Sequence, residues 1–588
     1  MKKEICFIFF VFSFVCVNAQ TEKKKDTVKT EIVNVISIYA PTIADASKVK
    51  KNPKIKLIER SKKKEMEYTI FSAPVASTFI PKSGVVKGIN IGIKERLYNN
   101  YLALGFGNFT SPFAELFLHK NTRFKQQYGL YTKYNASLEN SIDDTFLDSN
   151  FSNFESSLYY GQKVRMLDWK VTFNTERNTY NWYGLPNFIT DTSLQNSINE
   201  EQRYNLFELI GDVSFEKSVI DKSKFTVNFF SDALESKELF ANLSTDFDIP
   251  LSYIDANAND IKLETTIEFL KGEFNQDYQG FDNESYSIFT ASLQPSYQFL
   301  FQDFSVKAGL KLFASLDFKN DANNFLIYPD ITVSTPILKD YISVYSGITG
   351  GLNTNTYKNF TDLNPFVSPT LFITQTSEKY NYFLGFNGKF NNNINFNIKG
   401  SHQEEEDKPL FIRNNSKSNG TNTVDSNSVP LKGFEYGNSF SVYYDDVKTT
   451  SIFAEVEYSI SEKIGIGVTG LFNDFTTTNT AEAWNLPNLK ATVFGKYNQE
   501  KWYAETALFY VGTRKEISYS GIYPSTFSNA QTVNRYVDVN LNGGYHFNDR
   551  FSAFLKLNNI LNSNYQRFEN FTVQGFQVLG GITYKFDF

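Results

Sequence analysis

Apolar and polar residues alternate one by one along the end of the chain, from Phe576 to Phe588. Phe, Val, Ile, Tyr and Gly occupy the even positions, and mostly polar or small residues occupy the odd positions from Gln577 to Asp587. A period of two predicts a β-strand with two different faces. A strand that turns one face to lipid and the other to a wet interior has this pattern. The stretch therefore predicts the closing strand of a membrane barrel.

The same period recurs upstream, in the stretches 304–318, 452–460, 537–547 and 551–557. Charged residues such as Lys307, Lys311 and Glu455 lie in the middle of these predicted strands. Charges in a dry core are costly, whereas a watered inner wall tolerates them. The pattern thus favours a transmembrane barrel over the alternative, a soluble β-sandwich whose apolar rows meet one another.

The predicted connections alternate in length. Polar turns at 391–393, 461–463, 499–500 and 548–550 are short, whereas the polar stretches 404–448, 473–487, 513–535 and 561–573 are long. Short turns on one side and long loops on the other are typical of up-and-down membrane barrels, whose chain end lies on the periplasmic side. Carried back to about residue 100, the alternation predicts an all-β, antiparallel barrel of about 22 strands over residues 96–588.

Three places leave the strand assignment open. The stretch 404–448 is long enough to contain an extra hairpin at 439–445, and 366–376 fits either a wall strand or a loop hairpin. The connection 250–259 is long for a periplasmic turn.

A secretory signal peptide is predicted at the start of the chain. Lys2 and Lys3 precede an apolar run over residues 5–17, and small residues lead to a cleavage site after Ala19. The run is too short to span a bilayer, which argues against the alternative of an anchoring helix. Residues 13–15 lack the small side chains of a lipoprotein site at Cys16. Both cysteines of the chain, Cys6 and Cys16, lie in this segment, so the mature chain has no disulfide and no thiolate metal site.

Composition agrees with an exported barrel. The chain is 16% aromatic, with 58 Phe and 35 Tyr, yet its mean hydropathy is only −0.34. After residue 19 no apolar run reaches the roughly 18–20 residues of a membrane helix. The net charge of −6 indicates no nucleic-acid partner. We expect no cofactor and no metal, because the three histidines are far apart, and the acidic run 404–407 is more simply a solvated loop than a cation site. We expect no enzyme either.

Two stretches resemble a known family. Leu555–Tyr565 (LKLNNILNSNY) resembles the "N-[LI]-[LF]-[ND]-x-x-Y" stretch before the last strand of TonB-dependent receptors, and 380–390 resembles a recurring hairpin of that barrel. The terminal residues Ile582, Tyr584, Phe586 and Phe588 resemble the signal that such barrels present to the barrel-assembly machinery. The resemblance implies a 22-stranded barrel among outer-membrane lipids, an energised TonB-type periplasmic partner, and import of a small nutrient such as an iron chelate, vitamin or glycan.

The chain departs from that family before the barrel. Its receptors carry a plug of well over about a hundred residues, which would close a lumen of this size. Here residues 20–95 form a short, partly Lys-rich segment, predicted to be a reduced plug or a lumen filler. Long outer loops folding inward, or a partner protein, are the alternatives. A TonB-type energy-coupling segment is predicted at Glu31, Ile32, Val33, Asn34 and Val35, with residues 26–28 as a second place for it and a plain linker strand as the alternative.

Three functions remain open on the sequence alone. The first is a transporter in the cell outer membrane, similar to TonB-dependent receptors. The second is a plugless barrel that serves as a structural or assembly component of an outer-membrane complex. The third is a passive pore.

Overall fold

The computed structural model describes residues 98–140, 142, 145–251, 259–278, 284–339, 341–525 and 528–587. The chain divides into two units, Met1–Lys82 and Ser83–Phe588, and the first lies wholly outside the described residues. The predicted signal peptide, the segment 20–95 and the energy-coupling residues Glu31–Val35 lie outside as well. They stay predictions.

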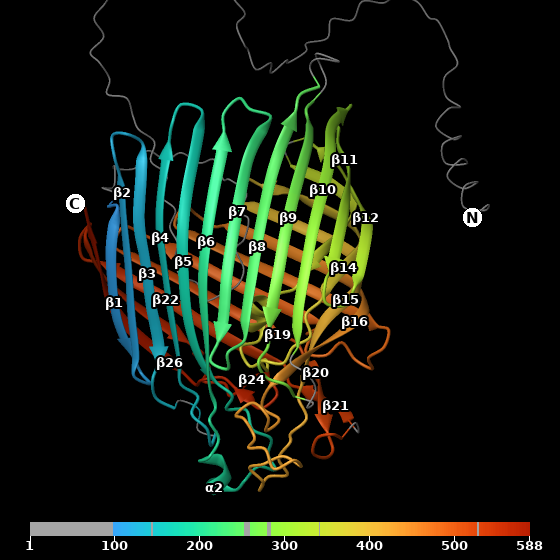
Figure 1. The fold of residues 1–588 in the computed structure, drawn as a ribbon. Helices are drawn as coiled ribbons and strands as arrows, with labels where there is room; N and C mark the ends of the chain where they lie inside the picture. Colours follow the sequence, from blue (N-terminus) through green and yellow to red (C-terminus); the bar gives the residue numbers. More distant parts are fainter. Residues whose placement is uncertain are drawn as a thin grey trace, which may run out of the picture. The chain divides into compact units, whose positions relative to one another are not determined.

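A single antiparallel sheet of 22 strands closes on itself, as the alternation predicted (Figure 1). The closure is made by β1, which pairs with β2 on one side and with β26 on the other. The wall strands are β1 (Asn100–Gly107), β2 (Ser111–Asn121), β3 (Gln126–Ser137), β4 (Phe151–Lys163), β5 (Leu167–Asn181), β6 (Glu201–Phe215), β7 (Ile220–Asp232), β8 (Lys237–Ile249), β9 (Ile261–Glu273), β10 (Ser285–Phe301), β11 (Phe304–Asp317), β12 (Ala322–Leu338), β13 (Ile342–Thr354), β14 (Gln375–Asn391), β15 (Ile394–Arg413), β16 (Phe440–Ser459), β17 (Ile464–Thr477), β18 (Leu489–Asn498), β19 (Trp502–Val511), β22 (Tyr536–His546), β23 (Phe551–Asn558) and β26 (Gln577–Phe586).

Four short strands and two helices lie outside this wall. They are the hairpin β20 (Arg514–Tyr519) and β21 (Ser528–Val533), the hairpin β24 (Gln566–Phe568) and β25 (Phe571–Thr572), and the helices α2 (Thr192–Gln195) and α3 (Tyr357–Leu363). Among the described residues, no helix has the length and hydrophobicity needed to cross a membrane. All of these elements belong to long connections between wall strands.

Apolar side chains form continuous rows on the outside of the wall. Val456, Val468, Val493 and Leu508 are register partners across four neighbouring strands, and each is between 37% and 48% exposed. Exposed aliphatic side chains that line up across neighbouring strands would be unfavourable in water and are expected against lipid tails. The row therefore confirms that the apolar face of these strands points outward.

The opposite face carries polar side chains. Lys307 forms an ion pair with Asp330 of the neighbouring strand at 2.6 Å, and Lys133 forms one with Glu155 at 2.9 Å. The prediction that Lys307 lies on the inner wall is therefore confirmed. Trp502 and Tyr545, with ring centroids 4.6 Å apart, lie beside the short turns, where membrane barrels place an aromatic girdle.

The short turns and the ends of the sheet lie at one end of the barrel, which we call the turn end, and the long connections lie at the other, the loop end (Figure 1). Because β26 ends at the turn end, this end faces the periplasm and the loop end faces outward. The alternative of an extra hairpin at 439–445 is excluded, since residues 440–445 begin β16 and pair with β15. The stretch 366–374 is loop, and β14 begins at Gln375. The connection after β8 spans 250–260, of which 252–258 are outside the described residues.

Strands β15 and β16 are 20 residues long each, about twice the 9–11 residues that cross a bilayer. The acidic run 404–407, predicted as a solvated loop, lies in β15 instead. Outward-facing Glu404 accepts a hydrogen bond from the Tyr380 hydroxyl at 2.6 Å, and Lys448 lies 3.3 Å from the same carboxylate. Such polar contacts on the outer face indicate that the upper part of these strands stands above the membrane.

Candidate functional site: the loop end of the barrel

The long connections fold together into one structure, which we call the cap. It consists of the described residues of the segments 182–200, 274–284, 355–374, 414–439, 512–535 and 559–576. These segments and the upper inner wall share one cluster of buried side chains, among them Trp182, Tyr204, Phe230, Leu270, Phe274, Tyr278, Tyr286, Tyr357, Phe360, Phe366, Phe434, Phe568 and Phe571. The loops thus bury apolar surface against one another, as a small protein core does.

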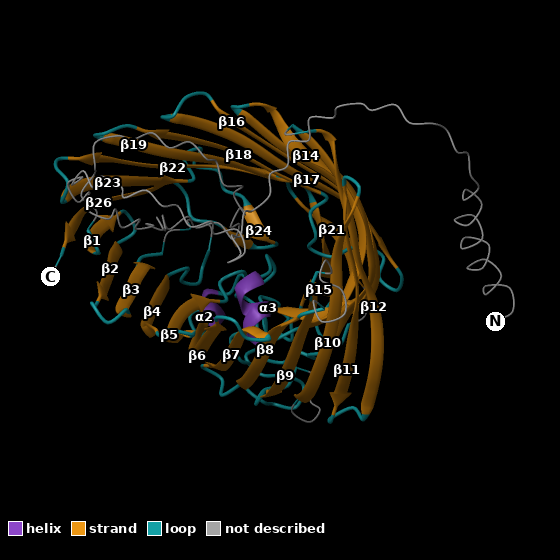
Figure 2. Cartoon of the chain, turned by 90° about the horizontal axis from the view of Figure 1, so that it is seen from above, coloured by secondary structure: helices purple, strands orange, loops and turns teal. Residues whose placement is uncertain are grey.

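Helix α3 lies within the ring of strands (Figure 2). Thr356 caps it by accepting a hydrogen bond from the Asn359 amide at 3.0 Å. Glu238 of β8, only 2% exposed, accepts hydrogen bonds from the amides of Tyr357 and Lys358 at 2.6 and 3.1 Å. A wall carboxylate therefore satisfies the free amides of the first turn of a loop helix.

Tyr357 anchors α3 to the wall. Its side chain is 0% exposed, and its ring centroid lies 4.9 Å from that of Phe274 and 5.3 Å from that of Phe230, both edge to face. Its hydroxyl donates to Asp232 of β7 at 2.9 Å. Asp232 also accepts from the amides of Leu234 and Ser236, so this buried carboxylate is well supplied with donors.

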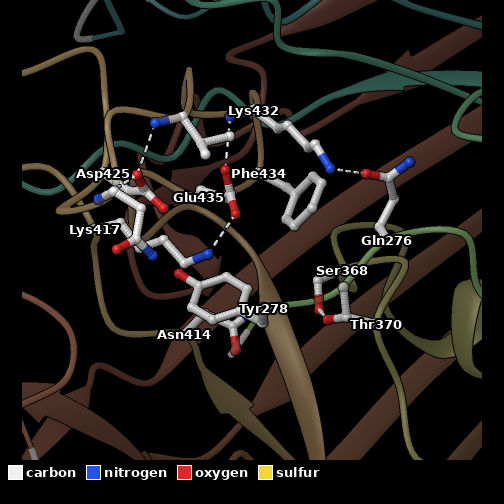
Figure 3. Close-up of polar contacts among 12 residues, drawn as sticks. Gln276, Tyr278, Ser368, Thr370, Asn414, Lys417, Asp425, Lys432, Phe434 and Glu435 are labelled. Atoms are coloured by element: carbon white, nitrogen blue, oxygen red, sulfur yellow. Dashed lines mark hydrogen bonds and ion pairs between the residues drawn. The ribbon is translucent and has the colours of Figure 1, made fainter. Parts of the chain in front are cut away.

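A second polar network ties the segment 414–439 together (Figure 3). The Lys417 ammonium lies 2.6 Å from Glu435 and 4.8 Å from the centroid of the Tyr278 ring. Glu435 also accepts from the Lys432 amide at 2.7 Å, and Lys432 reaches Gln276 of the segment 274–284. The segments 414–439 and 274–284 are therefore joined by polar contacts as well as by aromatic packing.

Glu516 of the hairpin β20–β21 is a fully buried carboxyl above the wall. It accepts hydrogen bonds from the Asn485 amide group at 2.5 Å and from the backbone amides of Arg413 and Ile517 at 3.1 and 2.9 Å. Burial nevertheless raises the pKa of Glu516 to about 7, because these donors and the Arg413 charge offset desolvation only in part.

We expect this carboxyl to make cap stability depend on pH. The pKa of Glu516 is raised above its unfolded value of 4.5, so its stabilising contribution is fully present below pH 4.5 and is lost as pH rises through about 7. Urea unfolding at pH 5 and pH 8 should show that E516Q removes a pH-dependent difference of about 2–3 kcal/mol. If the free energy of unfolding depends on pH equally in the wild type and E516Q, this expectation is contradicted.

A recess of about 160 Å³ lies between α3 and the inner wall of β5–β7. Its polar lining includes Glu176, Tyr180, Lys358, Asp362 and Arg567. Lys358 lies 2.7 Å from Asp362 and 3.4 Å from Glu176. Burial lowers the pKa of Lys358, but the two carboxylates outweigh it and the pKa is raised. The Arg567 guanidinium donates to the Leu363 carbonyl at 3.3 Å.

Of the residues predicted to act as an assembly signal, Ile582 and Tyr584 are exposed on the outer face of β26, at 46% and 41%. Phe586 ends the same strand, and Phe588 lies outside the described residues. Among the described residues, no three His, Cys, Asp or Glu side chains are grouped as a metal site would require. The cap itself was not predicted in detail. Its only sequence signal was the run of aromatic residues in the loop segment 355–374, which includes Tyr357, Phe360, Phe366 and Phe372.

No protein-family model matches the sequence, and no curated protein matches it in sequence. Solved structures do match the fold. The ferripyoverdine receptor of the outer membrane of Pseudomonas aeruginosa aligns with a TM-score of 0.57 and 12% identity, over 83% of this chain and 72% of the receptor. This chain has the barrel fold of outer-membrane receptors. The siderophore receptor PirA from Acinetobacter baumannii aligns with a TM-score of 0.58 and 12% identity, over 83% of this chain and 80% of PirA. The FrpB iron transporter from Neisseria meningitidis aligns with a TM-score of 0.60 and 10% identity, over 84% of this chain and 82% of FrpB.

These structures are TonB-dependent outer-membrane receptors, so the predicted resemblance is confirmed for the fold. The identities of 10–12% carry the likeness no further than the fold. The lipid-facing rows of the barrel indicate that the chain lies in a membrane.

Proposed function

We propose that this chain is an outer-membrane transporter that takes up a small solute with the help of an energised, TonB-type periplasmic protein. The cap carries the proposal. A barrel of this strand number encloses a lumen wide enough for solutes and is normally plugged. Because the loops of the cap bury apolar surface against one another and the wall, we expect solute entry to require their movement, which argues against a passive pore.

The matched proteins are named for the uptake or recognition of iron compounds, which supports a nutrient as the cargo. An iron chelate, a vitamin or a glycan remains the proposed cargo class. Energy coupling through Glu31–Val35 and partial filling of the lumen by residues 21–94 belong to the same proposal. Assembly into outer-membrane lipids by the barrel-assembly machinery, guided by the terminal residues Ile582 to Phe588, is proposed as well.

Uptake in a strain that lacks the chain tests this function. The strain would be supplied with the full chain, with a chain lacking residues 31–35, or with a control chain lacking residues 60–64. Under limitation for the cognate nutrient, we expect loss of 31–35 to lower uptake at least tenfold, to the level of a strain without the energising complex. The control deletion should leave uptake unchanged. Uptake that depends on neither the chain nor the complex would favour a structural role.

A further inference from the structure

Three cationic side chains converge where the cap meets the lumen: Lys490, Arg514 and Arg567. They come from β18, β20 and β24, which are far apart in the sequence. Among the described residues, none of the three forms an ion pair within 4.0 Å. Lys490 and Arg567 are exposed. Like charges at short range repel one another, so the cluster is unfavourable unless a group of opposite charge completes it.

Strand pairing fixes how close two of these charges lie. Lys490 is the register partner of Val511, and Val511 is the register partner of Tyr536, so all three face the lumen in one row. Two interstrand spacings separate the backbones of Lys490 and Tyr536 by about 10 Å. The Arg514 guanidinium lies 5.4 Å from the centroid of the Tyr536 ring. Lys490 therefore faces the lumen from the same row as the Tyr536 ring that Arg514 contacts.

Arg514 also positions the strand that carries the third charge. Its guanidinium donates to the carbonyl of Gln566 at 2.7 Å, and Arg567 is the next residue. The Arg514 side chain is 5% exposed, and its Nε has no acceptor among the described residues. Burial lowers the pKa of Arg514, and the charge of Arg567 contributes in the same direction. A buried guanidinium with an unused donor is unfavourable unless an acceptor completes it.

The nearby carboxylates have other partners, and Glu516, whose charge acts on Arg514, accepts a hydrogen bond from the Asn485 amide group at 2.5 Å. Asp538 accepts from the Tyr565 hydroxyl at 2.9 Å, and Asp362 is paired with Lys358 at 2.7 Å. Glu569 lies 3.4 Å from Arg413.

We propose that Lys490, Arg514 and Arg567 form an anion-binding site at the lumen side of the cap, which takes the carboxylate or phosphate group of a small solute. Arg567 and Lys490 contact the anion, and Arg514 holds β24 in place and adds a second guanidinium. Planar guanidinium groups match such anions with paired hydrogen bonds. This inference rests on the proposed transport function, because it assigns an anionic cargo to the transporter.

Binding of two probes, inorganic phosphate and succinate, to the purified full chain in lipid nanodiscs tests the site. Isothermal titration at low ionic strength should show that R567A and K490A each raise Kd about tenfold, whereas R567K gives a smaller rise. The matched control is K496A, on the same strand and the same face but at the turn end. It should bind as the wild type does. Binding should weaken with added salt.

The proposal is overturned if the wild type binds neither probe, or if R567A and K490A bind as tightly as K496A. Preference for phosphate or for succinate tells which anionic group the cargo carries, and both results support the site. The shifted band of each unheated variant in gel electrophoresis confirms that the variant is a folded barrel. Because the assay uses purified protein without an energising complex, anion binding with no nutrient uptake in cells would refute the transport function and leave the site standing.

Discussion

Replacing Tyr357 with alanine will open the cap. The substitution removes a fully buried aromatic ring from between Phe274 and Phe230 and leaves Asp232 without its hydroxyl partner. Truncation of a buried aromatic residue costs about 3–5 kcal/mol. A loss of about 3 kcal/mol raises the open population roughly a hundredfold. Trypsin cleavage after Lys358, in the freed α3, should therefore become much faster in Y357A.

The matched variant is Y357F, which keeps the ring and removes only the hydrogen bond to Asp232. We expect it to cost about 1–2 kcal/mol, so its cleavage rate should fall between those of the wild type and Y357A. Cells that carry Y357A should also become more sensitive to large hydrophilic antibiotics if α3 is the main obstruction of the loop end. Equal cleavage of Y357A and the wild type would show that α3 is held by other contacts.

A single added methyl group at Gly433 should have an effect of similar size. A Cβ at this position would lie 1.7 Å from the backbone carbonyl oxygen of Asn199, in the neighbouring cap segment 182–200. No side chain can rotate away to relieve this contact, so one of the two backbones must move. We expect G433A to lose about 3 kcal/mol of cap stability, measured as the urea midpoint for loss of protection against proteolysis.

The control for this substitution is G400A. A Cβ at Gly400, on the outer face of β15, meets no atom within 4 Å. We expect it to change stability by less than about 0.5 kcal/mol. If G433A and G400A behave alike, the contact between the segments 182–200 and 414–439 is looser than the structure indicates.

The wall could be predicted from the sequence because its information is local. A residue's face follows from whether its position in the strand is odd or even, so the stretches 304–318 and 537–547 each indicated one face without knowledge of their neighbours. Turns at 461–463 and 548–550 are short and polar, and they fixed where strands reverse. The number of strands followed from these two signals.

The cap could not be predicted in this way because its contacts are long-range. Tyr357 and Asp232 are 125 residues apart, and Glu238 and the Lys358 amide are 120 residues apart. Neither pair leaves a periodic trace in the sequence. The sequence left an extra hairpin open at 439–445 for a related reason. Hydrophobic alternation in β15 and β16 is interrupted by polar residues such as Glu404, whereas both strands continue past them to the buried Leu410 and Phe440.

The length of β15 and β16 has a consequence for how the cell surface presents this protein. At about 3.3 Å per residue, half of each strand extends roughly 30 Å along its own direction past the hydrocarbon. This part of the barrel wall carries polar residues such as Glu404 and Lys448 on its outer side, and its ladder of backbone hydrogen bonds makes it rigid. Antibodies or phages approaching sideways would meet a firm, folded epitope here, independent of whether the loops above it are open or shut.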